Sequence, residues 1–395
     1  MAFSLPSVPL ANGVKVLKCG SCGRKHRPLH VEGNGSAGVL IVLGQPTQYQ
    51  SETRSWFSGN STLLRVFDNQ GFNVREECWV TGVFSCFGNS SNYEYCISKL
   101  EDAIVTTQPS LIVTAGDVAT GAILRLYNPH HFGLGYTSNL YMGRMIPLQR
   151  TDNKFGCWLA PTLSEKDIHS YSNPVMEGVA KDWVSKHVNY AMDNYAIPPK
   201  PLDHPEPELL YGTSDIVTAL HQASESPYSA FDYETNCLQP EQEKARVLTA
   251  SVAFGDSNGM QRGVAFPLSS EVVKLAWVEF LRSKSKKIIA NVKFEERWSS
   301  VLFKQPINNF YWDVCIGARV RDCYSGVAGL KFLTFEHFGV IGYDDDVAPY
   351  IDNDDTQYNR LMKMDVNKLL LYNCLDSIYT YAVAMKQHEE FGLEF

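Results

Sequence analysis

Five prolines fall between residues 196 and 208, in the stretch AIPPKPLDHPEPE. Proline fixes the backbone angle φ and has no amide hydrogen to donate, so this stretch cannot form a helix interior or a central strand. The chain has 395 residues, enough for about two to three domains of typical size. We therefore predict a linker at residues 196–210 that separates a domain at 1–195 from a domain at 211–395.

Short apolar runs alternate with amphipathic stretches before this linker. The runs at 39–44, 78–84 and 110–116 are typical of buried strands, whereas 62–72 and 94–106 are typical of helices. Strands that alternate with helices indicate a parallel sheet covered by helices. We expect the first domain to be an α/β fold with a parallel sheet.

The second half begins with three strand-like segments in close succession: SAFDYET, VLTASVAFGD and GVAFPL. Their short connections are typical of antiparallel hairpins. Helix-like and strand-like segments then alternate up to residue 303, and the rest is mainly helical. A three-strand meander followed by α/β alternation predicts a ribonuclease H-like mixed sheet, so we expect both domains to be α/β.

The composition limits the functions that the chain can have. Its formal net charge of −8 excludes a protein that coats nucleic acid through a generally basic surface, because phosphate contacts provide most of such affinity. A nuclease can be acidic, because carboxylates that hold metal ions add negative charge. No apolar run approaches the ~20 residues of a membrane helix, and the N-terminus lacks a secretion signal. We expect no membrane association and a cytoplasmic location, in a host cytoplasm if a phage encodes the chain.

Four carboxylates occur in settings that can bring them together. Asp232 and Glu234 alternate along a predicted strand, so their side chains point to the same face. Glu295 lies where a predicted strand becomes a helix, and Asp376 lies on a helix with Tyr372 one turn earlier on the same face. Converging carboxylates repel one another unless a cation lies among them. The set predicts a site for Mg²⁺ or Mn²⁺, which prefer oxygen ligands.

Such a site suits phosphodiester hydrolysis. This reaction needs an activated water and stabilisation of the charge that develops on the leaving oxygen. Two divalent ions about 3.5–4 Å apart provide both. The hydroxyl of Tyr372 would orient the attacking water.

The segments FDYET, NVKFE and YNCLD, in this order, resemble the three motifs of the DEDD exonucleases of the tyrosine subtype. The similarity covers roughly residues 225–390 and is greatest to the proofreading domain of bacterial and phage DNA polymerase I, a family A polymerase. It implies a 3′→5′ exonuclease that acts on a single-stranded DNA 3′ end with two Mg²⁺ or Mn²⁺ ions, and that Tyr372 positions the water. The metal ligands that it implies are Asp232, Glu234, Glu295 and Asp376.

The second motif carries one departure and two implied substrate contacts. Glu295 stands where the bacterial pattern usually has Asp; it keeps the charge and the ligand type but is one methylene longer. By the same resemblance, Asn291 and Lys293 are candidate nucleic-acid contacts, and Asn291 would either touch the substrate or hold the end of the strand.

Four of the ten cysteines could form one site in the N-terminal half. Cys19 and Cys22 form a CxxC motif, and Cys86 and Cys96 come later with nine residues between them. Disulfides are disfavoured in a cytoplasm, whereas four cysteines suit either Zn²⁺ or an iron–sulfur cluster. The spacing alone leaves a cluster, zinc and no metal open.

Residues 17–185 resemble the iron–sulfur uracil-DNA glycosylases through VLIVLGQP, WFSGNSTLL, CWVTGVFSC and LIVTAGDVATGAIL. The resemblance implies a glycosylase-like parallel-sheet domain with a [4Fe–4S] cluster, Zn²⁺ being the alternative. It also matches Phe57 to the aromatic ring that stacks on a flipped base. The cluster ligands that it implies are Cys19, Cys22, Cys86 and Cys96.

Glycosylase activity itself is not expected. Gln45 stands where this family commonly has an acidic residue, and Gly82 stands where an Asn reads the edge of uracil. A His-Pro-Ser-like motif occurs as Ala160-Pro161-Thr162, without the His. Base reading and charge stabilisation are both lost. The departures predict a catalytically dead domain that binds DNA or docks onto a polymerase.

A glycosylase-like domain followed by a proofreading exonuclease resembles the front end of some phage family A polymerases. No palm or fingers sequence follows the third exonuclease motif, so the chain is either a subunit that partners a separate DNA polymerase or a fragment of a longer one. We expect a separate subunit, because the chain starts with Met and ends after the exonuclease domain. Two alternatives stay open: an accessory DNA-binding or processivity module without significant nuclease activity, and a uracil-sensing protein.

Overall fold

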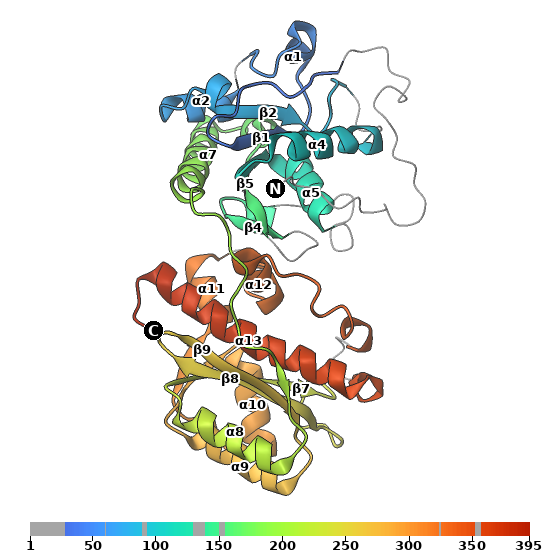
Figure 1. The fold of residues 1–395 in the computed structure, drawn as a ribbon, viewed down its shortest axis with the longest axis vertical. Coiled ribbons are helices and arrows are strands. Elements are labelled where there is room, and N and C mark those ends of the chain that lie inside the picture. Colours follow the sequence, from blue (N-terminus) through green and yellow to red (C-terminus); the bar gives the residue numbers. More distant parts are fainter. Residues whose placement is uncertain are drawn as a thin grey trace. The chain divides into compact units, whose positions relative to one another are not determined.

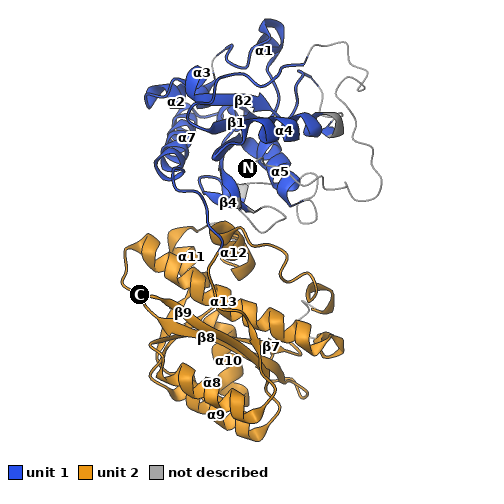
Figure 2. Ribbon diagram, in the orientation of Figure 1, with its two compact units in different colours: residues 1–201 blue, residues 202–395 orange. Residues whose placement is uncertain are grey.

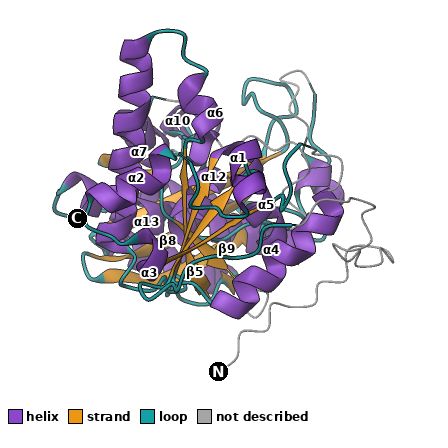
Figure 3. Cartoon of the chain, turned by 90° about the horizontal axis from the view of Figure 1, so that it is seen from above, coloured by secondary structure: helices purple, strands orange, loops and turns teal. Residues whose placement is uncertain are grey.

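The computed structural model describes residues 28–59, 61–88, 93–128, 139–149, 155–323, 325–351 and 357–395. The chain divides into two compact units, residues 1–201 and 202–395 (Figure 2). The described part of each unit contains one β-sheet with helices packed on it (Figure 1, Figure 3). Both units are therefore α/β, as the sequence predicts.

The N-terminal sheet has the strand order β2-β1-β3-β5-β4. Its strands are β1 (Val39–Leu43), β2 (Cys78–Gly82), β3 (Leu111–Ala115), β4 (Ile146–Gln149) and β5 (Phe155–Thr162). Its helices are α1 (Gln48–Thr53), α2 (Thr62–Asn69), α3 (Val74–Glu77), α4 (Tyr93–Thr107), α5 (Gly116–Tyr127), α6 (Glu165–His169) and α7 (Pro174–Asn194), with a short 3₁₀ turn at Asn139–Tyr141.

The prediction of a purely parallel N-terminal sheet is wrong at one strand. Strands β1, β2, β3 and β5 pair in parallel, but β4 pairs with β5 antiparallel. Only residues 150–154 separate β4 from β5. A parallel crossover needs about a dozen residues or more, so this connection can form only an antiparallel pair. The sheet is mixed.

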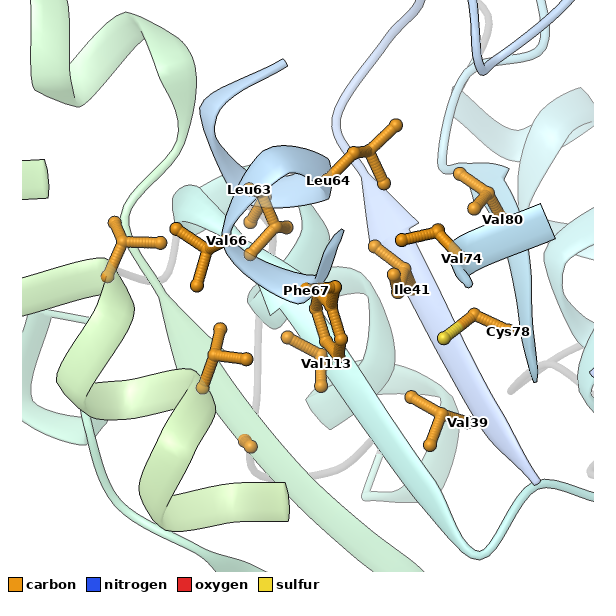
Figure 4. Packing of buried hydrophobic residues seen from close by; sticks show 14 of the residues in the cluster. Val39, Ile41, Leu63, Leu64, Val66, Phe67, Val74, Cys78, Val80 and Val113 are labelled. Carbon is orange, nitrogen blue, oxygen red and sulfur yellow. The ribbon is translucent and has the colours of Figure 1, made fainter. Parts of the chain in front are cut away.

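The core of this unit lies between the sheet and its helices. Val39 and Ile41 of β1 and Val113 of β3 belong to one buried cluster with Leu63 and Phe67 of α2 (Figure 4). Strand β1 lies between β2 and β3 and is hydrogen-bonded to both. Its continuous apolar run fits this position, because a central parallel strand is covered on both faces.

The C-terminal sheet has the strand order β11-β10-β7-β8-β9-β6. Its strands are β6 (Glu208–Leu209), β7 (Tyr228–Thr235), β8 (Val247–Asp256), β9 (Gly259–Pro267), β10 (Lys286–Ile289) and β11 (Phe310–Asp313). Its helices are α8 (Thr213–Glu225), α9 (Glu271–Arg282), α10 (Val292–Leu302), α11 (Val314–Arg321), α12 (Leu330–Phe338) and α13 (Val366–Phe391), with 3₁₀ turns at Ala348–Tyr350 and Leu361–Lys363.

This sheet is mixed, and it has the three-strand meander followed by α/β alternation that the sequence predicts. Strands β7, β8 and β9 form an antiparallel meander, and β10 and β11 then continue the sheet in parallel with β7. Strand β6 adds to the other edge, parallel to β9. The predicted linker at 196–210 therefore contains strand β6 of this sheet near its end. Near its start, the Ile197 carbonyl accepts a hydrogen bond from the indole of Trp158 at 2.8 Å.

Side-chain alternation along β7 assigns its residues to two faces. Phe231 and Tyr233 pack with Trp277 of α9 in one core. Ala230 packs with Ile378 of α13 in the core on the opposite face. Because alternate residues of a strand share a face, the even-numbered carboxylates of β7 face α13.

Candidate active site

Three carboxylates meet where β7 passes under α13. Ligand oxygens of Asp232, Glu234 and Asp376 all lie within 4.8 Å of one another. Burial raises the pKa of both Asp232 and Glu234 well above the usual range, and the Asp376 charge raises each further. The Lys331 ammonium opposes both shifts. The structure brings together these three of the four predicted ligands.

Glu295 interacts electrostatically with the three carboxylates of this cluster but is not one of its three members. It is in the first turn of α10, which begins after Asn291 in a left-handed conformation with φ 71°. The residue is 2% exposed, and its Oε2 has no hydrogen-bond partner among the described residues. Burial raises its pKa well above the ordinary value, as do, in decreasing order, the charges of Asp232, Glu234 and Asp376.

These four residues fit a divalent cation. All four offer oxygen atoms, which are the ligands that Mg²⁺ and Mn²⁺ prefer. A buried polar atom without a partner is costly, and the Oε2 atom of Glu295 has none within the part of the chain that the structure describes. A bound cation would satisfy this oxygen and neutralise the repulsion within the cluster. The residues that could hold metal are therefore Asp232, Glu234, Glu295 and Asp376.

Tyr372 lies beside the cluster, one turn before Asp376 on α13. Lys331 of α12 donates a hydrogen bond to its hydroxyl oxygen at 2.6 Å, and the same ammonium lies 3.1 Å from Asp376 Oδ1. Burial, then the charges of Asp376 and Glu234, raises the pKa of Tyr372 well above its ordinary value. The hydroxyl therefore remains protonated and can orient a water through hydrogen bonds.

Two further side chains bond to the cluster. The Tyr343 hydroxyl donates to Asp376 Oδ1 at 2.7 Å, and Asn373 Nδ2 donates to Asp232 Oδ2 at 2.8 Å. Sequence reasoning missed both of them, and it missed Lys331. Asn373 could have been found, because it follows Tyr372 directly in YNCLD. Tyr343 lies in a loop, where no periodic pattern marks it.

The two candidate substrate contacts of the second motif are exposed. Asn291 and Lys293 are both at the surface where α10 begins. The Asp313 carboxylate accepts hydrogen bonds from the backbone amides of Asn291 and Val292, at 3.3 and 2.7 Å. This contact fixes the first turn of α10, which carries Glu295.

The predicted cysteine site is only half described. Cys86 and Cys96 are both buried, at 8% and 7% exposure. Cys19 and Cys22 lie outside the described residues. The four-cysteine site therefore stays a prediction.

The structure describes three positions that the glycosylase resemblance singles out: Gly82, Phe57 and Gln45. A Cβ atom on Gly82 would lie 2.3 Å from Cη2 of Trp56, whose side chain is fully buried. Phe57 is half-buried, and the guanidinium of Arg75 lies 4.4 Å from the centre of its ring. Gln45 is exposed. Trp56 thus fills the space that a larger side chain at residue 82 would need.

No helix in the described ranges combines the length and the apolarity needed to cross a membrane.

Neither a family model nor a curated protein matches the chain. Among solved structures, it is similar to the catalytic core of RRP6 from Trypanosoma brucei, with 13% identity and a TM-score of 0.36, covering 48% of this chain and 49% of that chain. It is similar to Brucella melitensis NrnC with bound Mg²⁺ (17%, TM-score 0.32, 47% and 81% covered). It is also similar to Escherichia coli RNase D, an exoribonuclease involved in structured RNA processing, with 12% identity and a TM-score of 0.35, covering 48% of this chain and 46% of that chain. The chain thus spans about half the length of two of these structures.

Proposed function

We propose that residues 202–395 form a metal-dependent 3′→5′ exonuclease. The observation that carries this proposal is the convergence of Asp232, Glu234 and Asp376 within 4.8 Å. The buried Oε2 atom of Glu295, which has no hydrogen-bond partner in the described ranges, supports it. A cluster of this kind is unfavourable without a cation, and two divalent ions are the common means of cleaving phosphodiesters.

The position of each residue suggests its role in the proposed reaction. Two Mg²⁺ or Mn²⁺ ions, when bound, would supply charge stabilisation and lower the pKa of a bound water. The four carboxylates would hold them. Tyr372 keeps its proton, so it would orient the attacking water rather than accept a proton from it. Lys331 donates to this hydroxyl and restricts its direction.

A single-stranded DNA 3′ end is the substrate that we propose. The motifs FDYET, NVKFE and YNCLD support DNA through their resemblance to family A proofreading domains. We propose that the chain proofreads for such a polymerase, as a separate subunit or as part of a longer chain. Purification of the chain together with a DNA polymerase would test the subunit.

We further propose that the N-terminal half is a glycosylase-like module without glycosylase activity, joined to the exonuclease near residues 196–210. The Trp56 ring fills the space that a larger side chain at residue 82 would need, and this supports the loss of base reading. Its four cysteines would hold a [4Fe–4S] cluster or Zn²⁺. Iron, sulfide and zinc analysis of the purified protein would distinguish these, and strand breaks at uracil above background, after alkaline treatment, would contradict the loss of activity.

The main test is digestion of 5′-labelled single strands with Mg²⁺ or Mn²⁺. Wild type should shorten a DNA strand stepwise from its 3′ end, and Asp232→Ala should not. Asp193→Ala, which changes an exposed carboxylate of α7, serves as the matched control and should keep full activity. A parallel RNA strand tests the substrate class. Equal digestion by wild type and Asp232→Ala would refute the proposal.

A further inference from the structure

Two uncharged hydrogen-bond donors contact the carboxylates of the site. The Tyr343 hydroxyl donates to Asp376 Oδ1 at 2.7 Å, and Asn373 Nδ2 donates to Asp232 Oδ2 at 2.8 Å. A carboxylate has two oxygens, so each donor leaves the other oxygen for a cation. Because the donors are neutral, they can fix a carboxylate without adding positive charge that would repel a divalent ion.

The amide of Asn373 is held in one orientation. Its side chain is fully buried, and Thr249 Oγ1 of β8 donates to Asn373 Oδ1 at 3.0 Å. Because the amide oxygen is occupied, the amide NH₂ must face Asp232. Ser251, also on β8, donates to the backbone carbonyl of Asn373 at 2.7 Å. Strand β8 thus holds Asn373 in place, and Asn373 in turn orients the carboxylate of Asp232.

Ring contacts hold the hydroxyl of Tyr343. Its ring packs edge-on against Tyr379, with centroids 4.8 Å apart, and lies nearly parallel to the ring of Tyr372 at 6.0 Å. The Lys331 ammonium approaches Asp376 Oδ1 at 3.1 Å and Oδ2 at 3.4 Å. Oδ1 therefore receives the two shorter contacts and Oδ2 a single longer one from Lys331, so Oδ2 is the more accessible of the two oxygens for a cation.

We propose that Tyr343 and Asn373 are positioning residues for metal binding, which turn Asp376 Oδ2 and Asp232 Oδ1 toward the ions. This inference rests on the proposed metal-dependent exonuclease. It adds two residues that lie outside the carboxylate–tyrosine set. Hydrogen-bond partners of metal ligands commonly change metal affinity by about 10- to 100-fold when removed.

The experiment measures Mn²⁺ binding directly, by electron paramagnetic resonance of free Mn²⁺ in a titration of the full chain without nucleic acid. Tyr343→Phe removes one oxygen and keeps the ring contacts, and Asn373→Leu removes the amide. Each should weaken Mn²⁺ binding by about 10- to 100-fold. If Asn373→Leu does not fold, Thr249→Val tests the same link by removing only the donor to the Asn373 amide.

The matched control is Tyr381→Phe. This buried tyrosine is also on α13, and its hydroxyl donates to the Asp256 carbonyl at 2.9 Å. It should bind Mn²⁺ like wild type, while thermal unfolding confirms that every variant is folded. In hydrolysis assays, saturating Mn²⁺ should restore much of the activity of Tyr343→Phe, because the substitution acts through the metal.

Unchanged Mn²⁺ binding in Tyr343→Phe and Asn373→Leu, or an equal loss in Tyr381→Phe, would overturn the inference. A wild-type protein that binds no Mn²⁺ would overturn both the inference and the proposed function. A wild-type protein that binds Mn²⁺ but digests neither DNA nor RNA would overturn only the proposed function.

Discussion

Neutralising Glu234 should stabilise the metal-free protein and should reduce the additional stabilisation that Mg²⁺ binding gives. Glu234→Gln keeps the shape of a buried side chain and removes one charge from a cluster whose ligand oxygens lie within 4.8 Å. Two unit charges at that distance repel by about 3.5 kcal/mol at an effective dielectric constant of 20. Partial protonation relieves some of this repulsion, so we expect a net gain of about 1–3 kcal/mol in the free energy of unfolding at pH 8.

The assay is thermal unfolding in EDTA and in Mg²⁺. A gain of this size should raise the unfolding temperature of the C-terminal unit by roughly 3–10 °C in EDTA. Two units can unfold in two transitions, and the transition that Mg²⁺ shifts in wild type identifies the unit that holds the site. Mg²⁺ at about 100 times its dissociation constant stabilises wild type by about 2.7 kcal/mol. Glu234→Gln should gain much less from Mg²⁺, because it has lost one of the four proposed ligands.

The pH dependence has a definite sign. The pKa of Glu234 is raised in the folded state, so above the unfolded value of about 4.3 the folded state binds more protons than the unfolded state. Stability then falls as pH rises through this range. The advantage of Glu234→Gln in EDTA should be greatest at pH 8 and shrink toward pH 5. The reasoning would be refuted if the variant were less stable than wild type in EDTA at pH 8, or if Mg²⁺ stabilised both proteins equally. The control is Glu389→Gln, which changes an exposed residue of α13.

Two further predictions concern single side chains. Lys331→Met should lower the single-turnover rate of a 5′-labelled strand by about 10- to 100-fold, because the hydroxyl that Lys331 holds would lose its orientation; Lys368→Met, which removes an ammonium paired with Asp346 at the surface, should not, and equal rates for wild type and Lys331→Met would contradict the role. Gly82→Asn should destabilise the N-terminal unit by about 1–3 kcal/mol through overpacking against Trp56, measured by thermal unfolding; an unchanged unfolding temperature would show that the indole can move aside.

The strand and helix patterns of the sequence predict much of the fold and part of the site. Asp232 and Glu234 share a face because a strand alternates, and Asp376 and Tyr372 share a face because a helix repeats every 3.6 residues. These local periodicities are visible in the sequence. The packing of α13 on the β7 face of the sheet is what brings the two pairs together, and the apolar residues of both elements indicate such burial.

Other parts of the site depend on contacts that no local pattern specifies. Tyr343 reaches Asp376 from a loop, and its position depends on ring packing against Tyr379. Glu295 is placed by a left-handed residue, Asn291, at the start of α10. Asn can adopt this conformation more readily than most residues, but the sequence alone does not say that it does so here. The antiparallel strand β4 was missed for a different reason, because Ile146–Gln149 is a short polar-ended segment without clear alternation.

The two halves of the chain differ in what their interiors would gain from a ligand. In the C-terminal unit, buried carboxylates repel one another, and a buried Glu295 oxygen lacks a partner among the described residues. Folding alone does not favour such an arrangement, because apolar residues of similar volume avoid both costs. In the N-terminal unit, the fully buried Trp56 fills the space beside Gly82, so a larger side chain at residue 82 has no room there. The repulsion within the carboxylate cluster therefore supports residues 202–395 as the location of the proposed chemistry.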